Sequence, residues 1–169
     1  ADDELAPSAS VLLHNPANGL RTGLRTVLCK ELQTRWSGKQ CIGEVESVLL
    51  VLAPVYLARY LVGRDAVGWI DDSLTLGFSI EGGSRVEDRD RSVITLHLVC
   101  AKLGTRIWFE YVGSKSNRAN GPSWLLSLDP WSSEHGLSIA QVYTPEWPWK
   151  SRLCKLVNYC EENLRAALE

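Results

Sequence analysis

Residues 105–123 read TRIWFEYVGSKSNRANGPS, and this stretch determines how the rest of the sequence is interpreted. Its apolar and aromatic residues predict a buried strand from Thr105 to Val112. A polar loop follows at Gly113–Lys115, and asparagine, glycine and proline then predict a tight turn over Asn117–Pro122. Turns of this kind often present a small polar side chain, so Asn120 is a candidate site residue.

The sequence before this strand alternates between helical and strand patterns. Residues 42–61 are almost entirely apolar and predict a helix covered on more than one side, which Pro54 kinks or splits. Val67–Asp71 predicts a second strand, followed by helices over Leu74–Ile80 and Glu87–Leu103. Strands separated by helices predict an α/β fold, in which the two strands are parallel neighbours in one small sheet.

The flanking sequence predicts three parts. Residues 1–39 are expected to form an arm with an amphipathic helix, and residues 40–123 an α/β core. Residues 124–169 are expected to form a Trp- and Pro-containing segment with a C-terminal helix. The helix of the first part is expected over Leu20–Trp36, where leucine and valine recur at helical spacing. Residues 124–136 are expected to be irregular, and Ile139–Tyr143 is expected to be an edge strand.

The composition is that of one globular domain. The chain has 169 residues, of which 45% are hydrophobic and 22% charged, and a net charge of −2 disfavours a protein that wraps nucleic acid. The longest apolar run, residues 48–58, has about half of the ~20 residues that a membrane span needs. The five cysteines match no zinc pattern and are expected to be thiols. A start at Ala1 without any methionine is compatible with processing on import into an organelle.

Three segments together resemble a known family. They read IGEVESVLLVLA, VGWIDDSLTL and RIWFEYVGSKSNRANGPS, starting at Ile42, Val67 and Arg106. They are similar to the RNase H-like domain that follows reverse transcriptase in retroelement polyproteins, above all to copies abundant in dinoflagellate algae, whose last motif typically reads like WFEYVPSKANPADGPSR. The resemblance covers Gln40–Ser123 and implies a truncated RNase H-like fold: a small, partly parallel sheet flanked by helices, plus a C-terminal helix.

The resemblance also implies a nuclease site, in which four carboxylates hold two Mg²⁺ ions. By motif, Glu46 matches the family's helix acid and Asp71 its strand-end acid, whereas Asn120 replaces the last aspartate. The family's first three strands should precede Gln40, and the acid of the first strand has no counterpart in residues 1–39. These catalytic positions are therefore expected to be degenerate and inactive, without a bound metal or other cofactor.

Two functions follow from these observations. The first is a non-catalytic structural subunit, a pseudoenzyme that docks into a larger protein assembly such as an organellar complex. Its interface would use an aromatic cluster. The cluster consists of Trp124, Trp131, Trp147 and Trp149. The alternative is a metal-dependent RNase H-type nuclease or RNA–DNA hybrid-binding module that uses Mg²⁺, with Lys115 and Arg118 on phosphates. A third interpretation is an α/β domain unrelated to this family.

Overall fold

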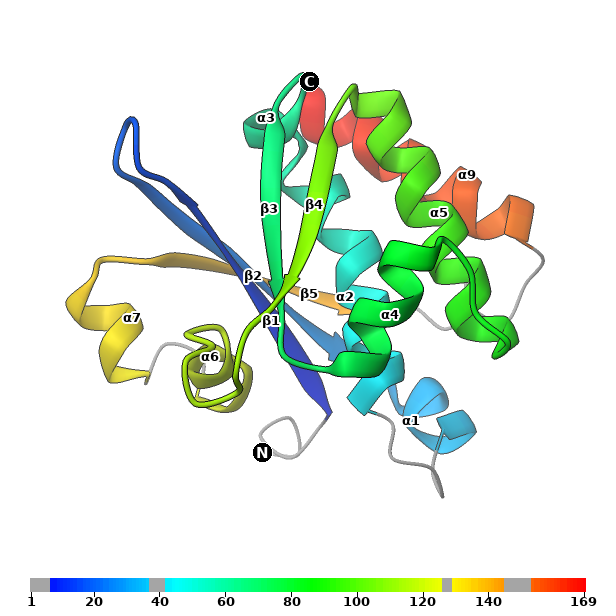
Figure 1. Cartoon of the computed structure of the whole chain (residues 1–169), viewed down its shortest axis with the longest axis horizontal. Coiled ribbons are helices and arrows are strands. Elements are labelled where there is room, and N and C mark those ends of the chain that lie inside the picture. Colours follow the sequence, from blue (N-terminus) through cyan, green and yellow to red (C-terminus); the bar gives the residue numbers. More distant parts are fainter. Residues whose placement is uncertain (1–6, 37–41, 126–128, 145–152) are drawn as a thin grey trace.

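The computed structural model describes residues 7–36, 42–125, 129–144 and 153–169. They form a mixed α/β fold with two separate small sheets and helices packed around them (Figure 1). One sheet has three strands in the order β1-β2-β5, and the other has two strands, β3 and β4. The predicted α/β class is confirmed, but the strands form two sheets where one was expected.

The three-stranded sheet is built on an N-terminal hairpin. Strands β1 (Ser8–Asn15) and β2 (Leu20–Leu28) are antiparallel, and β5 (Ser138–Thr144) adds to the other edge of β2 in parallel. The hairpin turn is stabilised by two asparagines, because the side chain of Asn18 accepts a hydrogen bond from the backbone N–H of Leu20 at 3.0 Å, and Asn15 caps Ala17 in the same way. The expected edge strand at residues 139–143 is confirmed.

The predicted helix over Leu20–Trp36 is wrong for its first half. Residues 20–28 form β2, and only α1 (Lys30–Trp36) is helical. The error has a physical cause: β2 is the central strand of its sheet and is buried from Gly23 to Leu28. A strand covered on both faces shows no alternation of apolar and polar residues, so its leucines matched a helical stripe by chance. The predicted arm over residues 1–19 likewise contains β1.

The two-stranded sheet confirms the expected parallel pair. Strands β3 (Asp65–Ile70) and β4 (Arg106–Tyr111) are parallel, with Val67 opposite Trp108 and Gly68 opposite Phe109. The opening stretch of sequence therefore contributes a strand, as predicted. The prediction that this strand is buried is wrong, because every residue of β4 is exposed or half-buried.

Two helices connect β3 to β4. Helix α4 (Ser73–Glu81) starts at Asp72, whose carboxylate accepts a hydrogen bond from the N–H of Thr75 at 2.7 Å. Helix α5 (Glu87–Leu103) ends at Gly104, which has the left-handed φ of 63° that glycine adopts easily. Both helices match their predicted ranges closely.

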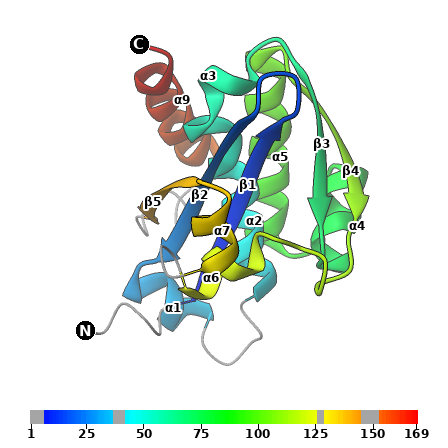
Figure 2. The same ribbon diagram turned by 90° about the vertical axis from the view of Figure 1, so that its left-hand side faces the viewer.

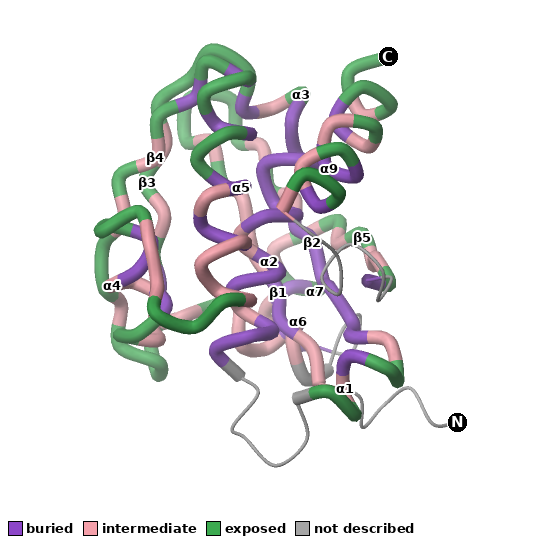
Figure 3. Tube along the Cα trace, turned by 90° about the vertical axis from the view of Figure 1, so that its right-hand side faces the viewer, coloured by how far each residue is buried: buried purple, intermediate pink, exposed green. Residues whose placement is uncertain are grey.

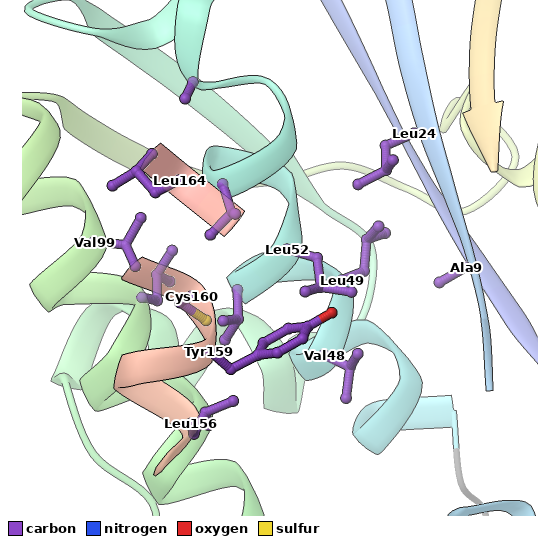
Figure 4. Packing of buried hydrophobic residues seen from close by; sticks show 14 of the residues in the cluster. Ala9, Leu24, Val48, Leu49, Leu52, Val99, Leu156, Tyr159, Cys160 and Leu164 are labelled. Atoms are coloured by element: carbon purple, nitrogen blue, oxygen red, sulfur yellow. The ribbon is translucent and has the colours of Figure 1, made fainter. Parts of the chain in front are cut away.

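The core lies around helix α2 (Ile42–Tyr56), which runs through the middle of the molecule. Figure 3 shows α2 as a largely buried segment, and α9 (Leu153–Leu168) and α5 pack against it. In Figure 4, Val48 and Leu52 of α2 lie close to Tyr159 of α9. Beyond Pro54 the helix breaks, and a short helix, α3 (Ala58–Leu61), follows, as the proline predicted.

The segment after the opening turn is more regular than expected. Helix α6 (Asn120–Leu125) begins inside the predicted turn over Asn117–Pro122, so the second half of that turn is helical. Helix α7 (Pro130–Glu134) lies in the region predicted to be irregular. Both are short, and tertiary contacts hold α6 in place. The hydroxyl of Ser8 donates to the carbonyl of Ser123 at 2.6 Å, and the hydroxyl of Ser10 donates to the carbonyl of Ala119.

The cysteines of the described part are free thiols, and Cys41 lies outside it. Cys154 and Cys160 do not pair, as their spacing predicted. Burial raises the pKa of Cys100 to about 11 and that of Cys160 to about 12. These two thiols therefore behave as small apolar core residues.

Candidate functional site

The candidate site lies where β3 ends. Asp71 directly follows this strand, and Asp72 caps the helix after it. The carboxyl end of a parallel strand is a common place for functional side chains. Because Asp72 is committed to the cap of α4, Asp71 is the acid at this point with a side chain available to the site.

Helix α2 brings Glu46 to the same place. Burial, together with the negative charges of Asp72 and Asp71, raises the pKa of Glu46 to about 7, although the Thr75 hydroxyl partly opposes this. The buried Oε2 of Glu46 has no hydrogen-bond partner among the described residues. Its neighbour Glu44 has a different role, because it pairs with Arg89 at 2.9 Å.

Asn120, the first residue of α6, completes this group. Its amide Nδ2 donates to Oδ2 of Asp71 at 3.0 Å and to the carbonyl of Ser114 at 3.0 Å. Both partners are acceptors, so the nitrogen of the amide, and not its oxygen, faces Asp71. The structure thus brings together Glu46, Asp71 and Asn120, which are far apart in the sequence.

These residues do not fit the pair of Mg²⁺ ions that the resemblance implies. Mg²⁺ binds oxygen ligands, and two such ions need several carboxylates to neutralise them. Here the amide N–H of Asn120 occupies an acceptor position of Asp71. The site is therefore a hydrogen-bonded polar cluster with too little negative charge for two divalent ions.

The two candidate phosphate-binding residues differ in their surroundings. Lys115 is exposed in the loop after β4. Arg118 is also exposed, and its guanidinium lies over the ring of Trp131, 5.6 Å from the centroid. Trp131 in turn stacks on His135 with 4.3 Å between the ring centroids.

The four tryptophans proposed for an interface are only partly described. Trp131 is half-buried and packs within the chain. Trp124 belongs to α6, but its side chain lies outside the described residues, as do Trp147 and Trp149 altogether.

Two other tryptophans were not singled out from the sequence. Trp69 on β3 and Trp108 on β4 are 62% and 69% exposed, on the outer face of the two-stranded sheet. Val67 lies directly opposite Trp108 and two residues before Trp69 on β3, and it is also exposed. Successive side chains of a strand point to opposite faces of the sheet. This rule, applied to VGWI and RIWF, places Gly68 and Phe109 on the inner face and would have predicted that Trp69 and Trp108 lie on the outer face.

A large cavity adjoins the polar cluster. It has a volume of about 940 Å³ and is lined mainly by β1, α2 and β3. Glu46, Asp71 and Asn120 all contribute to its wall. Most of the remaining lining is apolar, with Leu49 and Ala53 of α2 among its residues.

Comparison of the chain with protein-family models, with curated proteins and with solved structures finds no match. Across the described part of the chain, no helix combines the length and the apolar character needed to cross a membrane.

Proposed function

We propose that this chain is a non-catalytic interaction domain, derived from an RNase H-like domain of a retroelement polyprotein, that docks into a larger protein assembly. One observation carries the non-catalytic part of the proposal. The amide of Asn120 donates a hydrogen bond to Asp71, the carboxylate that would have to bind metal. An aspartate at position 120 would supply charge to a metal site, whereas this amide consumes a lone pair of the neighbouring ligand.

The arrangement of the elements supports the proposed origin. The resemblance implies strands before the first long helix, and the hairpin of β1 and β2 stands there. It also implies that the helix acid, the strand-end acid and the residue of the last motif share one site. Glu46, Asp71 and Asn120 line one cavity.

The exposed aromatic face supports the proposed role. Large, rigid aromatic side chains are the residue type most enriched at the energetic centres of interfaces. Trp69 and Trp108 are exposed on neighbouring strands, with Val67 directly opposite Trp108. A face of this composition suits contact with another protein better than contact with phosphate groups.

The test is a cleavage assay on an RNA–DNA hybrid with Mg²⁺, run with the chain as given and with Asp71→Asn beside it. We expect no cleavage by either protein. We also expect that 10 mM Mg²⁺ shifts the melting temperature no more than a Na⁺ solution of equal ionic strength. Metal-dependent cleavage that Asp71→Asn abolishes would overturn the proposal.

The alternative function is a metal-dependent nuclease or a hybrid-binding module. The observation that favours it is the grouping of Glu46, Asp71, Asn120 and Arg118 on the wall of one cavity, with Lys115 exposed in the loop that leads to Arg118. It predicts hybrid binding that weakens steeply with salt and that Lys115→Ala reduces. Our proposal predicts no such binding at physiological ionic strength, and a binding titration at two salt concentrations decides between the two functions.

A further inference from the structure

The cavity between the two sheets has the form of a groove with a strand edge on either side. β1 is an edge strand of the three-stranded sheet, β3 pairs with β4 alone, and both strands line the cavity. Figures 1 and 2 show β1 and β3 as the facing strands of the two sheets, running in opposite directions. Apolar residues of α2 and α5, including Leu49 and Leu96, also line it.

The free edge of β1 presents unpaired backbone groups to this groove. The N–H of Leu28 donates to the carbonyl of Pro7 at 3.2 Å, which marks these opposite residues as a hydrogen-bonded pair. Such pairs alternate along an antiparallel ladder. The backbone groups of Ser10 and Leu12 therefore point away from β2.

The free edge of β3 also presents unpaired backbone groups to the groove, from the side opposite β1. The carbonyls of Arg64 and Ile70 accept hydrogen bonds from the strand segment of β4, at 3.2 and 3.0 Å. Even-numbered residues of β3 thus face β4, and the backbone groups of Val67 and Trp69 face the other way. Unpaired edges of this kind are templates for another strand.

The groove is acidic at one end. Glu46 and Asp71 contribute to its lining, and neither carboxylate forms an ion pair with a described residue. Arg118 also lines the cavity, and its guanidinium lies over the ring of Trp131. A cationic side chain entering the groove at this end would meet the carboxylate of Asp71 and would draw Glu46 toward its charged form, in a largely apolar setting where the attraction is strong.

We propose that the groove binds one extended strand of a partner polypeptide, which pairs with β1 on one edge and with β3 on the other and joins the two sheets into one. The bound strand is apolar on the side that faces α2 and carries a lysine or arginine at the end next to Glu46 and Asp71. It runs parallel to one neighbour and antiparallel to the other, since β1 and β3 run in opposite directions. This inference rests on the proposed interaction role and names the kind of partner.

The experiment is a selection from a phage-displayed library of random nine-residue peptides. The chain is the bait, and Ala66→Arg, which places a charged side chain on the half-buried inner face of β3, is used for counter-selection. Circular dichroism checks that this variant keeps its fold. We expect enriched peptides with apolar residues at every second position and a lysine or arginine near one end. Replacing that cation by leucine in a synthetic copy should weaken binding about tenfold, and replacing the central residue by proline should abolish it.

Hydrogen exchange then locates the bound peptide on the unmodified chain. We expect new protection at Ser10, Leu12, Val67 and Trp69. Three results would overturn the inference: no enrichment, enriched peptides that protect none of these amides, or protection that arises from dimerisation of the chain by itself. Enriched peptides that carry an acid at that end and bind only with Mg²⁺ would overturn the charge assignment. Because the cleavage assay does not use these peptides, a failed selection would leave the non-catalytic proposal standing, and observed cleavage would leave the groove standing.

Discussion

The two sheets of this protein differ in how they are covered. In the first sheet, β2 is buried from Gly23 to Leu28 between two neighbouring strands and α2. In the second sheet, the inner face packs on helices while the outer face leaves Trp69 and Trp108 largely exposed. The difference indicates that the first sheet is part of the stable core. The second sheet packs on the core with one face only and leaves its other face exposed.

The largest change in the free energy of unfolding is expected for a residue in the buried strand β2. Leu24→Ala removes a side chain of β2 that is 1% exposed and should lower the free energy of unfolding by about 2–5 kcal/mol. Trp69→Ala, on the exposed face, should change it by less than about 0.5 kcal/mol. Urea unfolding of both variants measures these values. Equal losses would mean that the second sheet is as much a part of the core as the first.

A second prediction concerns the inner face of the two-stranded sheet. A Cβ at Gly68 would lie 2.8 Å from the ring of Phe109, so Gly68→Ala should cost about 1–3 kcal/mol. Gly77 in α4 is the matched control, because a Cβ there meets nothing within 4 Å. Gly77→Ala should be neutral or should stabilise the protein by up to about 1 kcal/mol, since alanine favours a helix. A tolerated Gly68→Ala would show that β3 and β4 pack loosely.

A third prediction tests the hydrogen bond that joins the two candidate site residues. Asn120→Asp replaces a donor to Asp71 by a second carboxylate and should lower the free energy of unfolding at pH 7.5 by about 1–2 kcal/mol. Asn158→Asp, at an exposed position of α9, makes the same chemical change without this contact and should have little effect. Equal melting temperatures for the two variants would contradict the assigned hydrogen bond.

The smallest effect is a pH dependence caused by Glu46. The pKa of this group is raised from 4.5 to about 7, so the folded state holds a proton that the unfolded state releases. Stability should therefore fall as the pH rises from about 4.5 to above 7. After allowance for solvent screening, the loss is about 1 kcal/mol by pH 8. Glu46→Gln should remove this part of the pH profile, whereas Glu162→Gln, at an exposed position of α9, should leave it unchanged.

Local signals predicted the part of the fold that lies between residues 42 and 112. A break near Pro54, an Asp cap at position 72, and Gly104 at a helix end each specify a boundary through nearby backbone chemistry. The hairpin was missed because a strand buried on both faces has no period of its own. The parallel partner of β2, strand β5, lies more than 100 residues further along the chain.

The structure places the three residues that the resemblance grouped on the wall of one cavity, and the hydrogen bond between two of them was not predicted. Motif order identified Glu46, Asp71 and Asn120 as members of one group. The direction of the Asn120 amide depends on the carbonyl of Ser114, which only the folded loop positions. The cavity could not be predicted either, because its walls are two strand edges from separate sheets. Sequence patterns describe the faces of strands and not their edges.

The most direct test of this account is backbone hydrogen exchange of the isolated chain, followed residue by residue with NMR. The central claim is that β1 and β3 present free edges to one groove. The account predicts fast exchange at Ser10, Leu12, Val67 and Trp69, and slow exchange at the alternate residues Val11 and Gly68, which face a paired strand. Slow exchange at all of these amides would contradict the account, because it would mean that the edges are already paired.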